Sequence, residues 1–148
     1  MSIGIALVSV GIAIGAWFRP LPKNEPPAAP TYSSQQVADA KAKVCAAYRV
    51  VRKALAATGS RDGGTDPTAT LAVATSSRQA LAVGSQYLSS KLDEAPATAV
   101  DLANAVHKLA GLYREIAINY LAEVDEADIE PLRRAAEQPS LDIDRLCQ

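Results

Sequence analysis

The chain has 148 residues and a formal net charge of −1, and 49% of its residues are hydrophobic, a fraction that alanine inflates. This length allows one folded domain, and the balanced charge excludes a strongly basic nucleic-acid-binding protein and a simple polybasic membrane patch. Beyond position 31 the only aromatic residues are tyrosines. Together with frequent Ala, Leu, Glu, Arg and Lys, this composition predicts closely packed helices with thin, alanine-lined interfaces.

The first element is an uncharged apolar run from Ile3 to Phe18. As a helix, the stretch from Ser2 to Phe18 would measure about 26 Å, just long enough for a hydrocarbon core of about 30 Å. The run ends on Trp17, Phe18 and Arg19, which are typical anchors at a membrane interface. We therefore predict a transmembrane anchor over residues 1–19. The alternatives are a cleaved secretory signal with small residues at the cut, and a buried core helix of a soluble protein.

One face of this predicted anchor carries Gly4, Gly11 and Gly15 at helical spacing. The pair Gly11 and Gly15 has the small-xxx-small spacing that lets two membrane helices approach closely. This face predicts packing of the anchor with a second copy of itself or with another membrane protein. The simpler alternative is that glycine is frequent in membrane spans.

Five prolines follow between Pro20 and Pro30. Residues 20–32 are therefore predicted to form a stiff, extended spacer that holds the folded domain away from the bilayer.

The first two predicted helices of the folded part have clear starting signals. Ser33 and Gln36 have the capping-box spacing, which predicts a helix over 33–59 that stops at a glycine. Asp66 is a typical N-cap with a proline in the first turn, and it predicts a second helix over 66–93.

The remaining helices follow a short turn. Thr98 is the predicted N-cap of a third helix that ends near Val124. Two prolines interrupt the rest of the chain. We therefore predict a short helix over 128–137, with Pro131 tolerated in its first turn, and a final turn or two over 140–147.

Short connections between long helices favour antiparallel neighbours. The predicted fold is therefore all-α: an N-terminal transmembrane helix, a proline-rich linker, and an antiparallel three- to four-helix bundle over residues 33–148. Folding the second helix back on the first would place Leu81 beside Val44. Folding the third on the second would place Arg78 beside Glu115, which predicts a structural ion pair across that interface.

The only cysteines are Cys45, near the start of the folded part, and Cys147, the penultimate residue. We predict that they form a disulfide that closes the bundle and implies an oxidising compartment. The alternative is two unrelated buried thiols in a cytosolic protein. With His107 as the single histidine, neither a metal site nor a cofactor is expected.

The predicted orientation of the anchor rests on two conflicting signals. Arg19 and Lys23 follow the apolar run, and by the positive-inside tendency they would place the domain in the cytoplasm. The cysteines favour the opposite side. We give the cysteines more weight and predict an extracytoplasmic domain on a single-pass protein of the cytoplasmic membrane, with the expectation that basic residues precede the apolar run in the natural chain.

Charge is unevenly distributed, since the first predicted helix is basic and the C-terminal part is acidic. We predict that the acidic part packs beside the basic helix. The alternative is that the acidic stretch 123–130 binds a cation or a basic partner, although it lacks the glycine and ligand spacing of a calcium loop. No nucleophile-plus-base pattern surrounds His107, so we do not expect an enzyme.

Several stretches resemble a known group of proteins: Phe18-Arg19-Pro20, Tyr32, the run from Gln36 to Tyr48, and the closing Leu146-Cys147. They are similar to mycobacterial single-pass, alanine- and proline-rich envelope proteins of unknown function, and the resemblance spans most of the chain. It implies a cell-envelope setting with the domain outside the membrane. It brings no activity and no catalytic residue.

From these features we expect a membrane-anchored accessory or scaffold subunit of the cell envelope that acts through protein–protein contacts. Its expected partners are other membrane or envelope proteins, or a second copy bound through the transmembrane helix. The alternative is a helical bundle that holds a lipid or another apolar small molecule between its helices, which the many small residues would permit.

Overall fold

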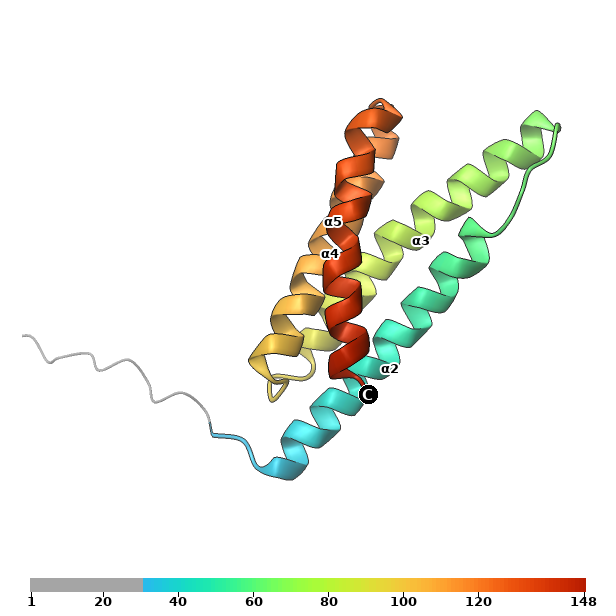
Figure 1. Ribbon diagram of the computed structural model, residues 1–148. Coiled ribbons are helices and arrows are strands. Elements are labelled where there is room, and N and C mark those ends of the chain that lie inside the picture. The colour runs from blue at the N-terminus through green and yellow to red at the C-terminus, as the bar shows by residue number, and fades with distance from the viewer. Residues whose placement is uncertain (1–30) are drawn as a thin grey trace, which may run out of the picture. The chain divides into compact units, whose positions relative to one another are not determined.

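The structure is a computed structural model that describes residues 31–148 (Figure 1). Four α-helices occupy this part of the chain: α2 (Ser34–Gly59), α3 (Pro67–Asp93), α4 (Val100–Leu121) and α5 (Glu126–Leu146). The predicted all-helical bundle is thereby confirmed. None of these four helices is long and apolar enough to cross a membrane.

The predicted anchor over residues 1–19 and most of the predicted spacer over 20–32 lie outside the described residues. The predictions for the glycine face and for the interface anchors therefore stay predictions. They concern Gly4, Gly11, Gly15, Trp17, Phe18 and Arg19.

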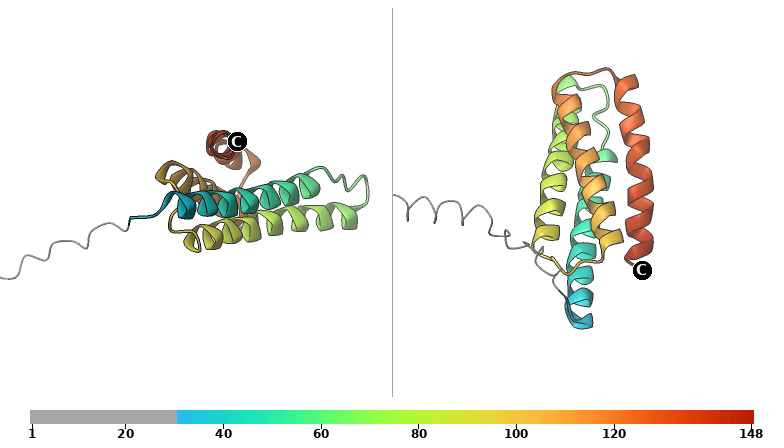
Figure 2. Two further views of the ribbon diagram at one scale, coloured as in Figure 1. Left: turned by 90° about the horizontal axis from the view of Figure 1, so that it is seen from below. Right: turned by 90° about the vertical axis from the view of Figure 1, so that its left-hand side faces the viewer.

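The helices form two antiparallel hairpins, α2 with α3 and α4 with α5 (Figures 1 and 2). The helix α3 packs against both α2 and α4, and α5 packs against α4. The two hairpins lie close together at the end of the bundle that holds the C-terminus, and they splay apart toward the α2–α3 and α4–α5 connections (Figure 1).

Two of the three predicted N-caps are confirmed. The hydroxyl of Ser33 accepts from the backbone N–H of Gln36 at 3.2 Å, and the Gln36 side chain accepts from the N–H of Ser33 at 2.8 Å. Asp66 likewise accepts from the N–H of Thr68 at 2.9 Å. The predicted cap at Thr98 is wrong, because its hydroxyl donates back to a carbonyl of the preceding turn and α4 begins two residues later.

The C-terminal part is one continuous helix, so the predicted break before residue 140 is wrong. Pro131 and Pro139 both lie inside α5. Each removes an N–H that would bond to the carbonyl four residues earlier, on Ala127 and Ala135. Both alanines are exposed, so water can satisfy their carbonyl groups. The ring of Pro139 is itself buried, and this burial offsets part of the cost of the lost bond.

The predicted register of α2 against α3 is also wrong. Leu81 lines two cavities together with Leu55, whereas the predicted register placed it beside Val44. A Cβ atom on Gly84 would lie 2.8 Å from a methyl group of Val51. The register differs from the predicted one because the connection after α2 folds along the first turns of α3. Gly63 of this connection lies so close to α3 that a Cβ atom on it would meet the backbone of Thr70.

The core is made mainly of aliphatic, alanine and tyrosine side chains from all four helices, and it includes the buried hydroxyl of one serine. The hydroxyl of Ser85 in α3 is buried and donates to the carbonyl of Ala110 in α4 at 2.6 Å. A buried hydroxyl needs such a partner, so this bond sets the distance between the two helices. The largest buried side chains are Tyr48, Leu88, Leu102, Leu109, Ile129 and Ile143.

Candidate functional site

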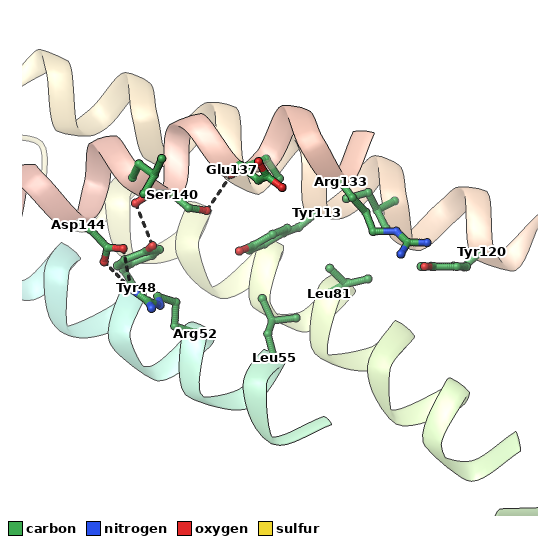
Figure 3. A pocket seen from close by; sticks show the side chains of 13 residues that line it. Tyr48, Arg52, Leu55, Leu81, Tyr113, Tyr120, Arg133, Glu137, Ser140 and Asp144 are labelled. Carbon is green, nitrogen blue, oxygen red and sulfur yellow. Dashed lines mark hydrogen bonds and ion pairs between the residues drawn. The ribbon is translucent and has the colours of Figure 1, made fainter. Parts of the chain in front are cut away.

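A groove of about 610 Å³ lies where the two hairpins diverge, and all four helices contribute to its walls (Figure 3). We call it the main groove. Its apolar walls are made of Tyr48, Leu55, Leu81, Tyr113, Ile116 and Tyr120. The polar groups along its rim belong mainly to α5, so the groove has an apolar floor and a charged edge.

The groove is open because α5 is held to α2 over only one half of its length. The disulfide between Cys45 and Cys147 joins the two helices at the C-terminal end of α5. About two turns of α5 before the disulfide, the hydroxyl of Tyr48 donates to the carbonyl of Ser140 at 3.1 Å. Ahead of Ser140, the described residues show no hydrogen bond or ion pair between α5 and α2.

One end of the groove is closed by an ion pair. The Arg52 guanidinium donates to both carboxylate oxygens of Asp144, at 2.6 and 2.7 Å (Figure 3). Both side chains are substantially exposed, so the pair contributes roughly 1 kcal/mol or less to stability. Arg52 also lies 5.8 Å from the ring centroid of Tyr48. The main effect of the ion pair is to orient the side chains of Arg52 and Asp144 at this end of the groove.

Two tyrosines of the groove, Tyr48 and Tyr113, remain neutral at physiological pH. Burial raises the pKa of the Tyr113 hydroxyl above its ordinary value of 10.0, and burial likewise raises the pKa of Tyr48. A buried phenolate would lose its hydration. The groove therefore offers aromatic surface and, at Tyr48 and Tyr113, neutral phenol groups.

The other end of the groove is built around Tyr120. The guanidinium carbons of Arg78 and Arg133 lie 5.9 and 6.0 Å from the centre of its ring. Arg133 forms ion pairs with Glu126 and Glu130 of its own helix, and its Nε atom is buried without a hydrogen-bond partner. Two cations therefore lie next to one aromatic ring at the mouth of the groove.

A second cavity of about 370 Å³ adjoins this end, and we call it the side pocket. It shares Leu55, Leu81 and Tyr120 with the main groove, and it adds Arg78 and the last turn of α2. The two cavities are therefore neighbours that have these three side chains in common.

Of the site residues predicted from the sequence, the cysteines are confirmed as a disulfide. Their Cα atoms are 5.7 Å apart, and 102 positions separate them in the chain. The bond fastens the end of the chain to the middle of α2.

The predicted ion pair between Arg78 and Glu115 is wrong. Arg78 lies against Tyr120, whereas Glu115 is exposed and its carbonyl accepts from the side chain of Asn119. The interface between α3 and α4 has nearly the predicted register, as the bond from Ser85 to Ala110 shows. The error is therefore one of helix face, since Glu115 points away from α3.

The predicted contact of the acidic C-terminal part with the basic first helix is present at two places. Arg52 pairs with Asp144, and the ammonium group of Lys41 donates to the carbonyl of Gln148 at 3.3 Å. The acidic side chains of the 123–130 stretch take no part in this. Within residues 31–148, no cluster of His, Cys, Asp and Glu side chains could hold a metal ion, and His107 is exposed.

The groove residues were not recognised as a site from the sequence. Tyr48, Tyr113 and Tyr120 fall on the helix stripes that predict core packing, and Leu81 has the same appearance. The available signal was that tyrosine supplies all the aromatic groups of the folded part, because a phenol on a core stripe often marks a boundary with water.

Comparisons with protein-family models, with curated proteins and with solved structures find no match to this chain.

Proposed function

We propose that this protein binds an apolar ligand in the main groove. The observation that carries the proposal is an open groove with an aliphatic and aromatic lining, to which all four helices contribute. Its volume of about 610 Å³ falls within the usual range for small-molecule sites, roughly 300–1,000 Å³.

The chemistry of the lining supports a ligand with an apolar body. Leu55, Leu81 and Ile116 offer aliphatic surface, and burying such surface stabilises a complex by about 25 cal/mol per Å². The neutral phenols of Tyr48 and Tyr113 add aromatic contacts and hydrogen-bonding groups at fixed positions. This environment suits a lipid or a similar molecule, and it offers no set of groups for catalysis.

The disulfide supports an oxidising compartment for this function, because such bonds persist mainly outside the cytoplasm. We propose that residues 1–19 tether the bundle to the outer face of the cytoplasmic membrane, as part of a cell envelope. This position would bring the groove next to a source of lipid.

A photoreactive, uncharged alkyl probe tests the proposed function on the full chain in phosphatidylcholine nanodiscs. We expect crosslinks on the groove-facing parts of α2, α3 and α4, mapped by mass spectrometry. Leu81→Gln should lower the labelling about tenfold, since a leucine side chain contributes roughly 1.5–3 kcal/mol when it is buried.

Val83→Gln is the matched control, because Val83 lies two positions away on α3 and is 62% exposed. Its labelling should equal that of the unchanged protein. Crosslinks scattered over the exposed faces, or equal labelling of the two variants, would contradict a binding groove. Thermal melting of each variant shows whether the bundle is still folded.

A second candidate function is a scaffold that acts through protein contacts. It is favoured by Ile118 and Leu121, which lie three residues apart on α4 and are 59% and 64% exposed. The expected result is that Ile118→Glu abolishes self-association of the full chain in analytical ultracentrifugation. A chain that is monomeric without any substitution would contradict the self-association form of this function.

A further inference from the structure

Arg78 differs from the other two arginines beside the groove. Arg52 pairs with Asp144, and Arg133 pairs with two glutamates of its own helix. Across the part of the chain that the structure describes, no carboxylate lies within ion-pair distance of Arg78. A partly buried guanidinium beside apolar surface attracts an anion, because its fork of N–H groups matches an oxyanion.

The end of α2 does not explain this position of Arg78. A cation beside a helix C-terminus can satisfy its last carbonyl groups, and α2 ends in the same pocket. Among the described residues no hydrogen bond joins Arg78 to these carbonyls. Two of them have backbone donors instead, since the N–H of Ser60 donates to Ala56 at 3.0 Å and the N–H of Arg61 donates to Thr58 at 3.4 Å.

Tyr120 fixes the place of the Arg78 charge. The guanidinium lies over its ring at 5.9 Å from the centroid, and such stacking leaves the N–H edges of an arginine available for hydrogen bonds. The same ring lines the main groove. The positive charge is therefore held where the apolar groove and the side pocket meet.

We infer that the ligand is a single-chain amphiphile with a carboxylate head, such as a long-chain fatty acid. This inference rests on the function proposed above. Arg78 binds the carboxylate in the side pocket, and the alkyl chain passes Leu55 and Leu81 toward Tyr48. From Tyr48 to Gly59, α2 measures about 16 Å, and an extended chain along this stretch would reach from the side pocket into the main groove.

Competition against the uncharged photoreactive probe tests this inference. The competitors are palmitate and the alcohol of the same chain length, added to the full protein in phosphatidylcholine nanodiscs at about pH 9, where the carboxyl group is ionised. Uptake by protein-free nanodiscs corrects their concentrations. We expect palmitate to compete about tenfold better than the alcohol, as befits a hydrogen bond to a charged group.

The Arg78→Gln variant should lose the preference for palmitate over the alcohol. Arg78→Lys should keep most of it, because the charge remains. Arg114→Gln removes the same charge from an exposed site on α4 that lines neither cavity. This variant should therefore keep the full preference for palmitate over the alcohol. Added salt should weaken binding of palmitate and leave the alcohol unaffected.

Equal competition by palmitate and the alcohol, or a preference that survives Arg78→Gln, would overturn the assignment of the head group and leave the apolar groove standing. Stronger competition by the corresponding alkylamine, or protection by phosphatidylglycerol alone, would overturn it as well. If neither palmitate nor the alcohol competes, the proposed function itself fails. These outcomes separate the two proposals.

Discussion

Individual residues decide how closely the helices can approach, and Gly84 is the clearest case. It is buried in α3 opposite Val51, at a separation where any Cβ atom would overlap a valine methyl group. Valine is branched at Cβ and has little rotamer freedom in a helix, so it cannot move aside. The absence of a side chain at position 84 therefore allows α2 and α3 to meet in their observed register.

Gly84→Ala should accordingly destabilise the protein by about 1–2 kcal/mol, because overpacking outweighs the gain in helix propensity. Gly111→Ala is the control, since Gly111 lies inside α4 with open space around its Cα atom. That change should stabilise by about 0.5–1 kcal/mol. Urea unfolding of both variants measures the difference, and equal effects would contradict the close contact at Val51.

At the scale of the helix, α5 shows how tertiary packing can override a local signal. Proline in a helix interior costs about 3 kcal/mol, and two of them predict a break. The buried stripe of Ile129, Ala136, Pro139 and Ile143 nevertheless keeps one straight face against α4. The apolar contacts of this face offset the missing hydrogen bonds, and the helix continues to the disulfide.

Pro131→Ala should stabilise the protein by about 1–3 kcal/mol, because it restores one helical bond at an exposed position. Pro139→Ala restores the same kind of bond but removes two buried methylene groups, which contribute about 0.8 kcal/mol each. Its gain should therefore be smaller. Urea midpoints of the two variants test this order, and a loss of stability in Pro131→Ala would show that its ring has a packing role.

For the whole molecule, the disulfide joins the end of α5 to α2 and encloses most of the folded chain. Cross-linking a loop of this size restricts the unfolded chain strongly. The same bond holds α5 over one end of the main groove and leaves the other end open. Stability and the shape of the groove therefore depend on one covalent link.

Reduction of the disulfide should lower the free energy of unfolding by about 2–5 kcal/mol. Urea unfolding with and without reductant measures this loss. The variant Cys147→Ser, which cannot form the bond, should already unfold at the lower urea concentration and should not respond to reductant. An unchanged midpoint for the reduced protein would mean that noncovalent contacts alone hold α5 in place.

The candidate site was less accessible to prediction than the fold. Periodicity placed Tyr48, Leu81 and Tyr113 on buried stripes, and the structure agrees that they face inward. A stripe does not reveal whether the helix opposite closes over it. That depends on where α5 diverges from α2, which no local pattern of residues specifies. Arg78 illustrates the same limit. Its contact with Tyr120 could not be predicted until the structure showed which side of α4 faces α3.

The sequence by itself determined the all-helical fold, two of the helix starts and the disulfide. These rest on composition, on bonds within three residues such as that between Ser33 and Gln36, and on the presence of only two cysteines. Only the tertiary structure decided the register at Gly84, the continuity of α5 through Pro139 and the open groove. These depend on packing between segments far apart in the chain, because the side chains on one helix determine where the next helix can pack.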